Sequence, residues 1–201
     1  MNPKALFHIT YGLYWLSVRS YGQDNACIIN TAVQVASDPL TISISVNKAN
    51  KTHNMIMESG RFNISALTVD TPFELFRRFG MQSGRDVNKF VGFEDVVRAD
   101  NGMYILNRYA SAYLCCRLLR TVDLGSHTLF IAALEDAQVI SNRPACTYSY
   151  YQSDIKPKPA EAKRKGWVCS VCGHVYEGEA LPEDYICPLC RHGRENFQPA
   201  G

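Results

Sequence analysis

Four cysteines near the end of the chain have a spacing that suits a metal ion. They form two Cys-x-x-Cys pairs, Cys169 with Cys172 and Cys187 with Cys190, on either side of a short connector. One tight turn of this kind presents two sulfurs to the same ion, and two such turns that meet complete a tetrahedral set of ligands. This geometry suits iron or zinc. The sequence therefore predicts a four-thiolate metal site, because paired spacing is far more specific than a lone pair of cysteines.

The residue after each pair decides how the turn can support anionic sulfurs. Gly173 follows the first pair and can adopt the left-handed backbone conformation that aims N–H groups at sulfur. The second turn carries Arg191 there, and a left-handed arginine would cost about 1–2 kcal/mol. Metal binding can absorb that cost, so we expect the site to form. Aromatic surface for a small surrounding core comes from Trp167, Tyr176, Tyr185 and Phe197.

These residues resemble rubredoxin, in the short form that ends rubrerythrin-like proteins. The likeness covers about residues 166–199: an aromatic residue two positions before each pair, Cys-x-x-Cys-Gly, Cys-Pro-x-Cys and a final Glu-Asn-Phe. It implies one iron ion that passes single electrons, with Cys169, Cys172, Cys187 and Cys190 as ligands. The alternative is a zinc ribbon that only stabilises a fold or binds a partner. Nucleic acid is disfavoured, because residues 167–201 carry five acidic side chains against two arginines.

Length and composition favour two domains in the cytoplasm. The 201 residues are 46% hydrophobic, enough for one full-sized core beside a small metal unit. The formal net charge of +2 predicts no nucleic-acid or membrane partner, and the apolar runs are too short to span a bilayer. The other four cysteines lack disulfide-like spacing. We expect two of them, the adjacent Cys115 and Cys116, to be buried on opposite faces of a strand.

The first 150 residues have strand patterns and few helical ones. Strands are expected at residues 11–21, 26–36, 41–46, 62–67, 103–122 and 127–140. Strict alternation in Thr41–Val46 indicates a half-buried strand with one polar face. Short helices are expected at 4–10, 53–59 and 71–80, the second ended by Gly60 and the third having Pro72 in its first turn. Several strands at short spacing predict a mainly β fold, a barrel in place of a parallel sheet.

The composition changes again at residues 152–166, which contain Lys-Pro-Lys-Pro and then Lys-Arg-Lys-Gly. We expect a basic linker there, between a first domain at residues 1–151 and the metal-ribbon domain at 167–201. Extended at about 3.1 Å per residue in its Pro-rich part, such a linker would let the two domains dock and undock.

A one-electron metal site needs a source of electrons, and flavin is the usual converter between hydride donors and one-electron acceptors. The polar segment 47–52 lies directly before an expected helix N-terminus, where a phosphate is well held. A capped helix behind a solvated loop would explain the same residues. The chain has no Gly-x-Gly-x-x-Gly motif, so a Rossmann nucleotide site is not indicated.

The order of motifs along this region resembles the flavin reductase family, in particular its members fused to a terminal rubredoxin, the high molecular weight rubredoxins. The matching segments are residues 30–39, 50–52 with the helix that follows, 60–64, 79–90 and 125–130. Each motif is loose by itself, whereas their order on one chain before a rubredoxin is specific. The resemblance implies a split β-barrel that binds FMN.

The same resemblance implies roles for individual residues. Along the isoalloxazine ring would lie, mainly through backbone groups, Thr31, Ala32, Val33, Gln34 and Val35. Around the phosphate would lie Lys48, Asn50, Lys51 and Thr52. The site would be completed, from the same chain or from the second subunit of a homodimer, by Ser83, Gly84, Arg85 and Lys89. His127 would lie where hydride arrives, although Ser126 replaces the acid of the family's Gly-Asp-His. The alternatives are a turn histidine for His127 and a solvated face for Arg85 and Lys89.

Together these features predict an enzyme that passes electrons from NAD(P)H through FMN to a four-cysteine iron centre. The resemblance implies a flavodiiron protein or rubrerythrin as its downstream partner. Two alternatives stay open: a free-flavin reductase with an accessory tail, and a barrel whose zinc ribbon serves protein interaction.

Overall fold

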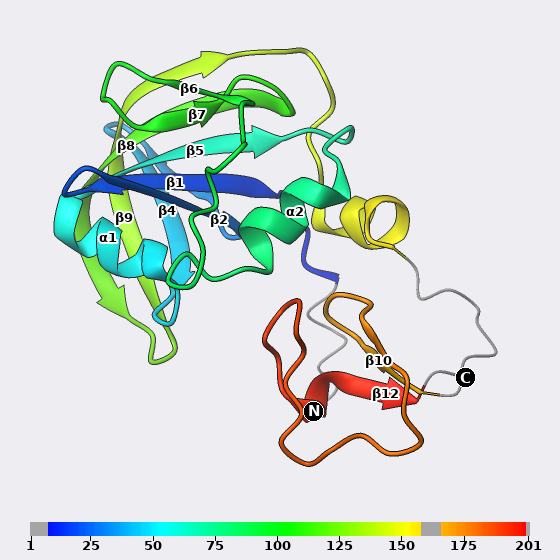
Figure 1. Cartoon of the computed structure of the whole chain (residues 1–201). Helices are drawn as coiled ribbons and strands as arrows, with labels where there is room; N and C mark the ends of the chain where they lie inside the picture. Colours follow the sequence, from blue (N-terminus) through cyan, green and yellow to red (C-terminus); the bar gives the residue numbers. More distant parts are fainter. Residues whose placement is uncertain (1–7, 158–165, 200–201) are drawn as a thin grey trace.

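The computed structural model describes residues 8–157 and 166–199, and it is mainly β, as the sequence predicted (Figure 1). The larger part has the strands β1 (Tyr14–Ser20), β2 (Gln23–Ile29), β3 (Val33–Ser37), β4 (Leu40–Asn47), β5 (Arg61–Leu67), β6 (Val96–Arg98), β7 (Tyr104–Leu106), β8 (Ala110–Asp123) and β9 (His127–Val139). Its helices are α1 (Lys51–Ser59), α2 (Phe73–Gly80) and α3 (Tyr148–Tyr150), which continues as the π-helical turn η2 (Tyr151–Ile155). We call this part, residues 8–157, the barrel.

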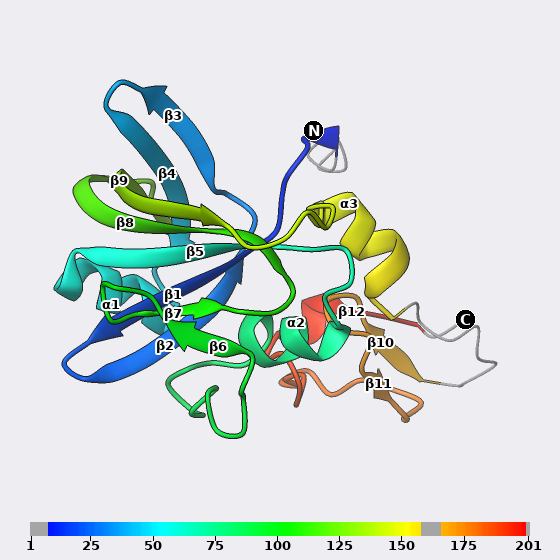
Figure 2. The same cartoon turned by 90° about the horizontal axis from the view of Figure 1, so that it is seen from above.

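Seven strands form one antiparallel sheet in the order β2-β1-β5-β8-β9-β4-β3, beside a β6–β7 ribbon. The edge strands β2 and β3 follow each other in the chain, separated only by residues 30–32. A flat sheet of seven strands would put its edges about 29 Å apart, whereas the four Cα–Cα steps from residue 29 to residue 33 reach at most about 15 Å. The sheet must therefore curl, and Figure 2 shows it curved, with β3 and β4 turned away from β1 and β2.

Two apolar clusters line opposite faces of the strands. Neighbouring side chains of a strand point to opposite faces, and Leu16 lies in the first cluster while Trp15 lies in the second. Helix α1 adds Met55 and Ile56 to the first cluster. The second receives Leu75, Phe76 and Phe79 from α2. Each helix thus covers one apolar face of the sheet.

The structure confirms the expected position of most strands and corrects three details. The expected strand at 26–36 is two strands, because residues 30–32 must cross between sheet edges. The expected strand at 103–122 is also two, since Tyr109 has a left-handed φ of 62° between β7 and β8. Strand β4 has no solvent-facing polar side over Thr41 and Ser43, which are 7% and 8% exposed, because β4 is an interior strand and these short side chains are flanked by residues of β9 and β3, such as Ile131 and Val33 beside Ser43.

The helices and the paired cysteines largely follow the sequence prediction. Helix α1 begins two residues earlier than expected and ends at Gly60, which has the left-handed φ of 65° that such an end requires. Cys115 and Cys116 are buried in different clusters, which confirms their opposite orientation. Pro72 precedes α2, whereas it was expected in its first turn. The expected helix at 4–10 falls mostly outside the described residues, and no helix among the described ones is long and apolar enough to cross a membrane.

The C-terminal unit (residues 166–199) is a separate three-stranded sheet in the order β11-β10-β12. It contains β10 (Trp167–Cys169), β11 (Val175–Tyr176), the short 3-10 helix η3 (Arg194–Asn196) and β12 (Phe197–Pro199). The segment expected to be an extended linker from residue 152 is helical through Ile155, and residues 158–165 lie outside the described part. Tyr151 anchors that helical turn by packing on Phe76, with ring centroids 4.6 Å apart.

Candidate functional site

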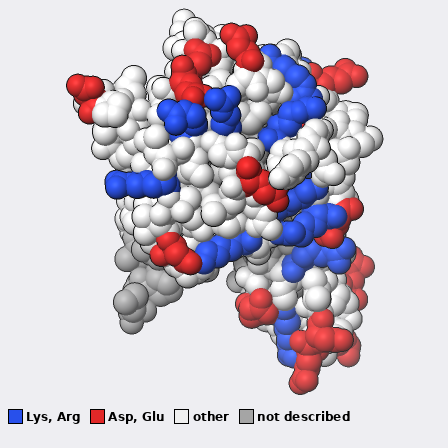
Figure 3. Space-filling model, turned by 90° about the vertical axis from the view of Figure 1, so that its left-hand side faces the viewer, with Lys and Arg blue, Asp and Glu red and all other residues white. Residues whose placement is uncertain are grey.

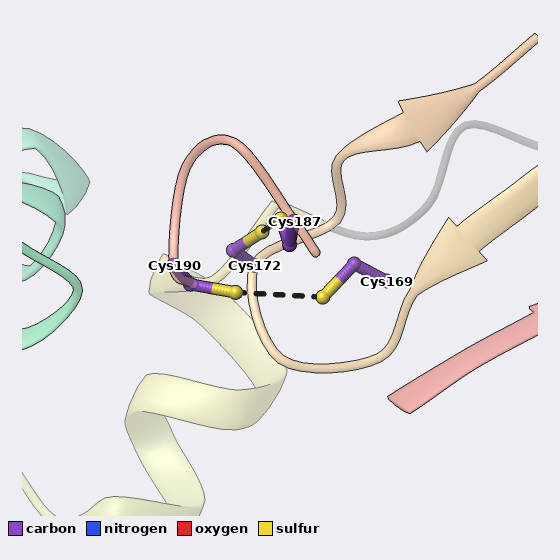
Figure 4. Close-up of side chains that lie close together, drawn as sticks. All are labelled: Cys169, Cys172, Cys187 and Cys190. Atoms are coloured by element: carbon purple, nitrogen blue, oxygen red, sulfur yellow. Dashed lines mark hydrogen bonds between the residues drawn. The ribbon is translucent and has the colours of Figure 1, made fainter. Parts of the chain in front are cut away.

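The four cysteines of the C-terminal unit bring their sulfurs together (Figure 4). All four Sγ atoms lie within 4.8 Å of one another, and all four side chains are buried. The sulfurs of Cys169 and Cys190 are 3.6 Å apart, and those of Cys172 and Cys187 are 3.4 Å apart. A tetrahedral ion with metal–sulfur bonds of about 2.3 Å needs sulfur–sulfur separations of about 3.8 Å. The geometry therefore fits one tetrahedral ion.

The two cysteine turns repeat the same backbone geometry. The N–H of Gly173 donates to the carbonyl of Cys169 at 2.8 Å, and the N–H of Arg191 donates to the carbonyl of Cys187 at 2.9 Å. Gly173 has a φ of 76° and Arg191 has a φ of 62°. The arginine thus adopts the left-handed conformation that we expected, and the second turn forms in spite of its cost.

Backbone N–H groups donate hydrogen bonds to the sulfurs, and these bonds stabilise the negative charge of neighbouring thiolates. The N–H of His174 donates to Cys172, and that of His192 donates to Cys190. Burial raises the pKa of the Cys172 thiol to about 12, so a cation must bind before this sulfur becomes a thiolate near neutral pH. Iron and zinc both fit this set of donors.

The first turn of α1 is a second place where charge can be held. Asn50 precedes the helix in an extended conformation, its side chain makes no capping hydrogen bond, and the first turn contains no acidic residue. The first N–H groups of a helix have no partner inside the helix and favour an anion. Lys51 is the first residue of α1, and the Lys48 ammonium three residues earlier lies 2.6 Å from Asp123. Three of the predicted phosphate residues therefore lie around one helix N-terminus.

The predicted ring residues lie at the crossing from β2 to β3. The hydroxyl of Thr31 donates to the carbonyl of Ser45 at 2.8 Å, which ties the crossing to β4. Ala32 is half-buried, whereas Val33, Gln34 and Val35 are exposed along edge strand β3. Ser45 lies three residues before Lys48, or about 10 Å along an extended chain. Strand β4 thus joins the predicted ring residues to the predicted phosphate residues.

A polar cavity of about 560 Å³ beside α1 brings together residues from distant parts of the chain. It is lined by Lys51, Gly84, Arg85 and Lys89, four of the predicted cofactor residues. Ser83 stands next to it, and its hydroxyl accepts the N–H of Arg85 at 3.1 Å. The loop that carries Ser83 to Lys89 reaches Lys51 within a single chain, so this proximity does not depend on a second subunit.

Lys89 and Thr52 lie inside the barrel. Lys89 is 6% exposed, and its ammonium donates to the carbonyls of Ala26 and Phe79, each at 3.0 Å, so it does not belong to a solvated face. Burial lowers the pKa of Lys89 to about 8. Thr52 is 1% exposed, and its hydroxyl accepts the side-chain amide of Asn25 at 2.9 Å. Both predicted residues thus brace the wall between α1, β2 and the loop after α2.

His127 begins β9 opposite Asn47 of β4 and is half-buried. Its Nδ1 lies 2.9 Å from the hydroxyl of Ser126, the residue that replaces the family's acid. A carboxylate is nonetheless close in sequence and space. Asp123 accepts the Lys48 ammonium, and this hydrogen bond lowers the pKa of Asp123. His127 and Lys48 therefore share one end of the barrel.

Sequence reasoning missed His53, which lies in the first turns of α1. Its Nε2 lies 2.9 Å from the hydroxyl of Thr128, and its ring packs edge-on against Phe130 with centroids 5.4 Å apart. The only signal for it in the sequence is its place just inside a helix expected to bind an anion.

A larger cavity of about 920 Å³ lies where the barrel meets the C-terminal unit. The barrel side includes Ile29 and Asn30, directly before the predicted ring residues, together with Tyr151. The C-terminal side consists of Ser170 and Val171, between two of the cysteines. Nothing in the sequence pointed to this cavity, because its walls meet only in the folded chain.

The family model of the flavin reductase like domain matches residues 6–158, well over half of the chain. The chain belongs to this family. The model of the rubrerythrin, rubredoxin-like domain matches residues 167–198 of this flavin reductase-like protein. Both resemblances drawn from the sequence are thereby confirmed.

Two curated relatives of this flavin reductase-like protein exceed 30% identity. It is 34% identical to the high molecular weight rubredoxin of Moorella thermoacetica, over 98% of this chain and 99% of that protein. It is 35% identical to the ferric-chelate reductase (NAD(P)H) of Archaeoglobus fulgidus, over 79% of this chain and 93% of that protein. The first relative matches both parts of the chain, while the match to the second covers a length close to that of the barrel.

Solved structures share the fold of the barrel. An NADH:FAD oxidoreductase of Streptomyces globisporus superposes with a TM-score of 0.66 at 21% identity, covering 73% of this chain and 86% of that one. An FMN-binding protein of Thermus thermophilus superposes with a TM-score of 0.65 at 23% identity, covering 74% and 86%. At these identities the likeness shows the flavin reductase fold, and it confirms the predicted fold class.

Proposed function

We propose that this protein passes electrons from NAD(P)H, through FMN in the barrel, to one iron ion in the C-terminal unit. A downstream redox protein, such as a flavodiiron protein or rubrerythrin, would then reoxidise the iron. One observation supports this most: a flavin reductase-like barrel and a buried four-sulfur set share one chain, and residues of the barrel line one cavity together with Ser170 and Val171 of the first cysteine turn. The choice of donor is supported by the similar ferric-chelate reductase (NAD(P)H) and NADH:FAD oxidoreductase, whose names give NAD(P)H and NADH as donors.

The barrel offers groups that fit FMN. The phosphate would be held by the uncapped start of α1 with Lys48, Asn50 and Lys51. The ring would lie along the backbone from Thr31 to Val35, where the edge strand β3 leaves space. Thr52 and Lys89 would brace the wall of the site through their buried hydrogen bonds. Gly84, Arg85 and Lys89 line the polar cavity at its side, and Ser83 stands next to it.

FMN would supply the conversion between a two-electron hydride and single electrons. Around it, the chain's residues would orient the nicotinamide and stabilise negative charge. The half-buried His127 lies at the same end as Lys48, so it can donate a hydrogen bond to a group at this rim. The Asp123 carboxylate fixes Lys48 in place at 2.6 Å.

Iron is the metal that this proposal requires, because zinc has no redox chemistry. The residues that would hold it are Cys169, Cys172, Cys187 and Cys190. The N–H groups of His174 and His192 that donate to sulfur would stabilise negative charge on the sulfurs, so they would favour the thiolate over the thiol and the reduced site over the oxidised one. Their role is therefore to keep the sulfurs ionised and fixed in position.

The proposal also includes a cytoplasmic homodimer. All eight cysteines lie in the described residues without a disulfide, which suits a reducing compartment. Strand β3 exposes Val33 and Val35 at 58% and 53%, and Leu40 after its turn at 48%. Such an apolar edge suits a second copy of the chain. Equilibrium sedimentation of the purified protein tests this part, and a monomer at micromolar concentration would contradict it.

An absorption spectrum with metal analysis of the intact chain tests the main proposal. Purified protein should contain about one FMN and one iron per chain, and both absorption bands should bleach with NADH under anaerobic conditions. If NADH bleaches the flavin band but does not change the iron band, the result favours the alternative of a free-flavin reductase with an accessory tail. A chain that contains stoichiometric zinc would support a structural ribbon and overturn electron transfer.

The placement of the phosphate has its own test. Lys51→Ala should weaken FMN binding at least about fivefold, because the variant removes a cation from an anion site at a helix N-terminus. Arg120→Ala is the matched control, since Arg120 is exposed and makes no ion pair among the described residues. Equal FMN dissociation constants for the two variants would contradict this placement.

A further inference from the structure

The cysteine turns of the C-terminal unit face the barrel. Figure 1 shows both turns on the side of the unit that lies toward α2 and the helix that ends in η2. Ser170 and Val171 of the first turn line the cavity that Phe76 and Tyr151 of the barrel also line. Exposed acidic side chains gather instead at the far tip of the molecule, which is the C-terminal unit in Figure 3. The unit therefore has one face toward the barrel and one toward solvent.

Two barrel residues make direct contacts with this face. The side chain of Met81, just after α2, packs against the apolar cluster that contains the four cysteines. The Lys156 ammonium, just after η2, donates to the carbonyl of Ser170 at 2.8 Å. One contact is apolar and the other is polar, and they lie on different elements of the barrel. Together they hold the cysteine cluster, and with it the first cysteine turn, against the barrel.

The barrel side of the same cavity leads to the predicted ring residues. Asn30 lines the cavity, and Thr31 follows it in the chain. On the other side of the cavity, Val171 lines it directly before Cys172 in the chain, and Tyr151 lines it from the barrel. Protein atoms around a single cavity thus connect the crossing between β2 and β3 with the first cysteine turn.

From this geometry we propose that Met81 and Lys156 are positioning residues that hold the first cysteine turn over the barrel, so that electrons reach the metal within one chain. The inference rests on the proposed electron transfer from FMN to iron. A hydride from NAD(P)H carries two electrons, and each ferric ion takes one to become ferrous. One hydride therefore reduces the iron twice, with the downstream protein oxidising it in between, and the proton of the hydride passes to solvent.

The test uses the full-length protein in anaerobic single-turnover mixing with NADH. If electrons do not pass between separate protein molecules, the rate constant for iron reduction stays the same over a tenfold range of protein concentration. Met81→Asp places a charge in the apolar contact and should slow iron reduction at least about tenfold, while flavin reduction stays unchanged. Lys156→Ala removes one hydrogen bond and should slow it about two- to tenfold. Met57→Asp is the matched control, because Met57 is 51% exposed on α1.

Hydrogen exchange supplies a readout that does not depend on electron transfer. In the Met81→Asp protein, backbone amides of residues 148–156 and 170–173 should exchange faster than in the wild type and in Met57→Asp. Iron reduction that accelerates in proportion to protein concentration would overturn the proposal, as would a Met81→Asp protein with wild-type rate and protection. Zinc in the site would defeat the proposed function, whereas the exchange experiment would still decide whether the contact exists.

Discussion

The barrel and the C-terminal unit obtain their cores in different ways. The barrel buries large side chains such as Trp15, Phe62 and Phe130 in clusters that, among the described residues, bring no group of metal-ligating side chains together. In the C-terminal unit, the four cysteines themselves make up most of the buried cluster, with Leu181 and Phe197 beside them. A unit of this size buries too little apolar surface to fold alone. The comparison shows that the barrel has an apolar core that does not depend on its candidate site. In the C-terminal unit, the metal-binding cysteines themselves form most of the core.

The largest expected effect comes from loss of the metal, which should unfold the C-terminal unit and leave the barrel folded. Cys190→Ser removes one of four ligands, and metal binding contributes on the order of 10 kcal/mol to folding in units of this kind. We expect the metal to be lost and residues 166–199 to become unprotected in hydrogen exchange, while the barrel keeps its thermal unfolding transition. Cys146→Ala, at a buried cysteine of the barrel, should keep full metal content. A metal-loaded Cys190→Ser protein would contradict this view of the core.

The reverse experiment disrupts the core of the barrel. Trp15 is fully buried, and its ring packs edge-on against Phe79 and Phe90. Trp15→Ala should therefore destabilise the barrel by about 3–5 kcal/mol. Its indole N–H has no hydrogen-bond partner among the described residues, so Trp15→Phe loses no hydrogen bond and should cost less. Urea unfolding followed by near-UV circular dichroism measures both. A barrel of unchanged stability in Trp15→Ala would show that the comparison is wrong.

A third prediction uses the buried lysine of the barrel. Burial lowers the pKa of Lys89 from 10.5 to about 8, so the folded state loses its proton first. Between pH 8 and 10.5 the unfolded chain binds more protons, and the stability of the barrel gains up to about 3 kcal/mol as pH rises. The unfolding free energy of the Lys89→Met protein should not show this rise with pH, because methionine does not titrate. Unfolding free energies of both proteins at pH 7.5 and about pH 10 measure the difference, and parallel pH profiles would refute the assignment.

The smallest effect concerns the second cysteine turn. Arg191 pays for a left-handed φ of 62°, so Arg191→Gly should stabilise the metal-bound unit by about 1 kcal/mol. Gly173→Ala should have the opposite effect in the first turn, since a Cβ there meets only the carbonyl oxygen of Pro157 at 3.9 Å and adds strain without a clash. Competition with a chelator, at equal concentrations of the two variants, ranks their metal retention. A tighter Gly173→Ala site would exclude backbone strain as the cause.

Much of the protein followed from local patterns in the sequence. The spacing of Cys169 and Cys172, repeated at Cys187 and Cys190, determined the ligand set, because a turn of four residues fixes its own geometry. The left-handed Arg191 was predictable for the same reason. Strand positions followed from residues that alternate or favour extended backbone, and the comparisons then confirmed both resemblances.

Only the tertiary structure decided which distant residues meet. Lys89 stays a predicted cofactor residue, but only the fold showed that its ammonium donates to the carbonyls of Ala26 and Phe79. The ion pair of Lys48 with Asp123 and the contact of Met81 with the cysteine cluster join residues that have no common pattern in the sequence. The physical reason is that periodicity and spacing specify only the local backbone. Which faces then come together depends on how the sheet curls between its edges and how the chain returns to the barrel.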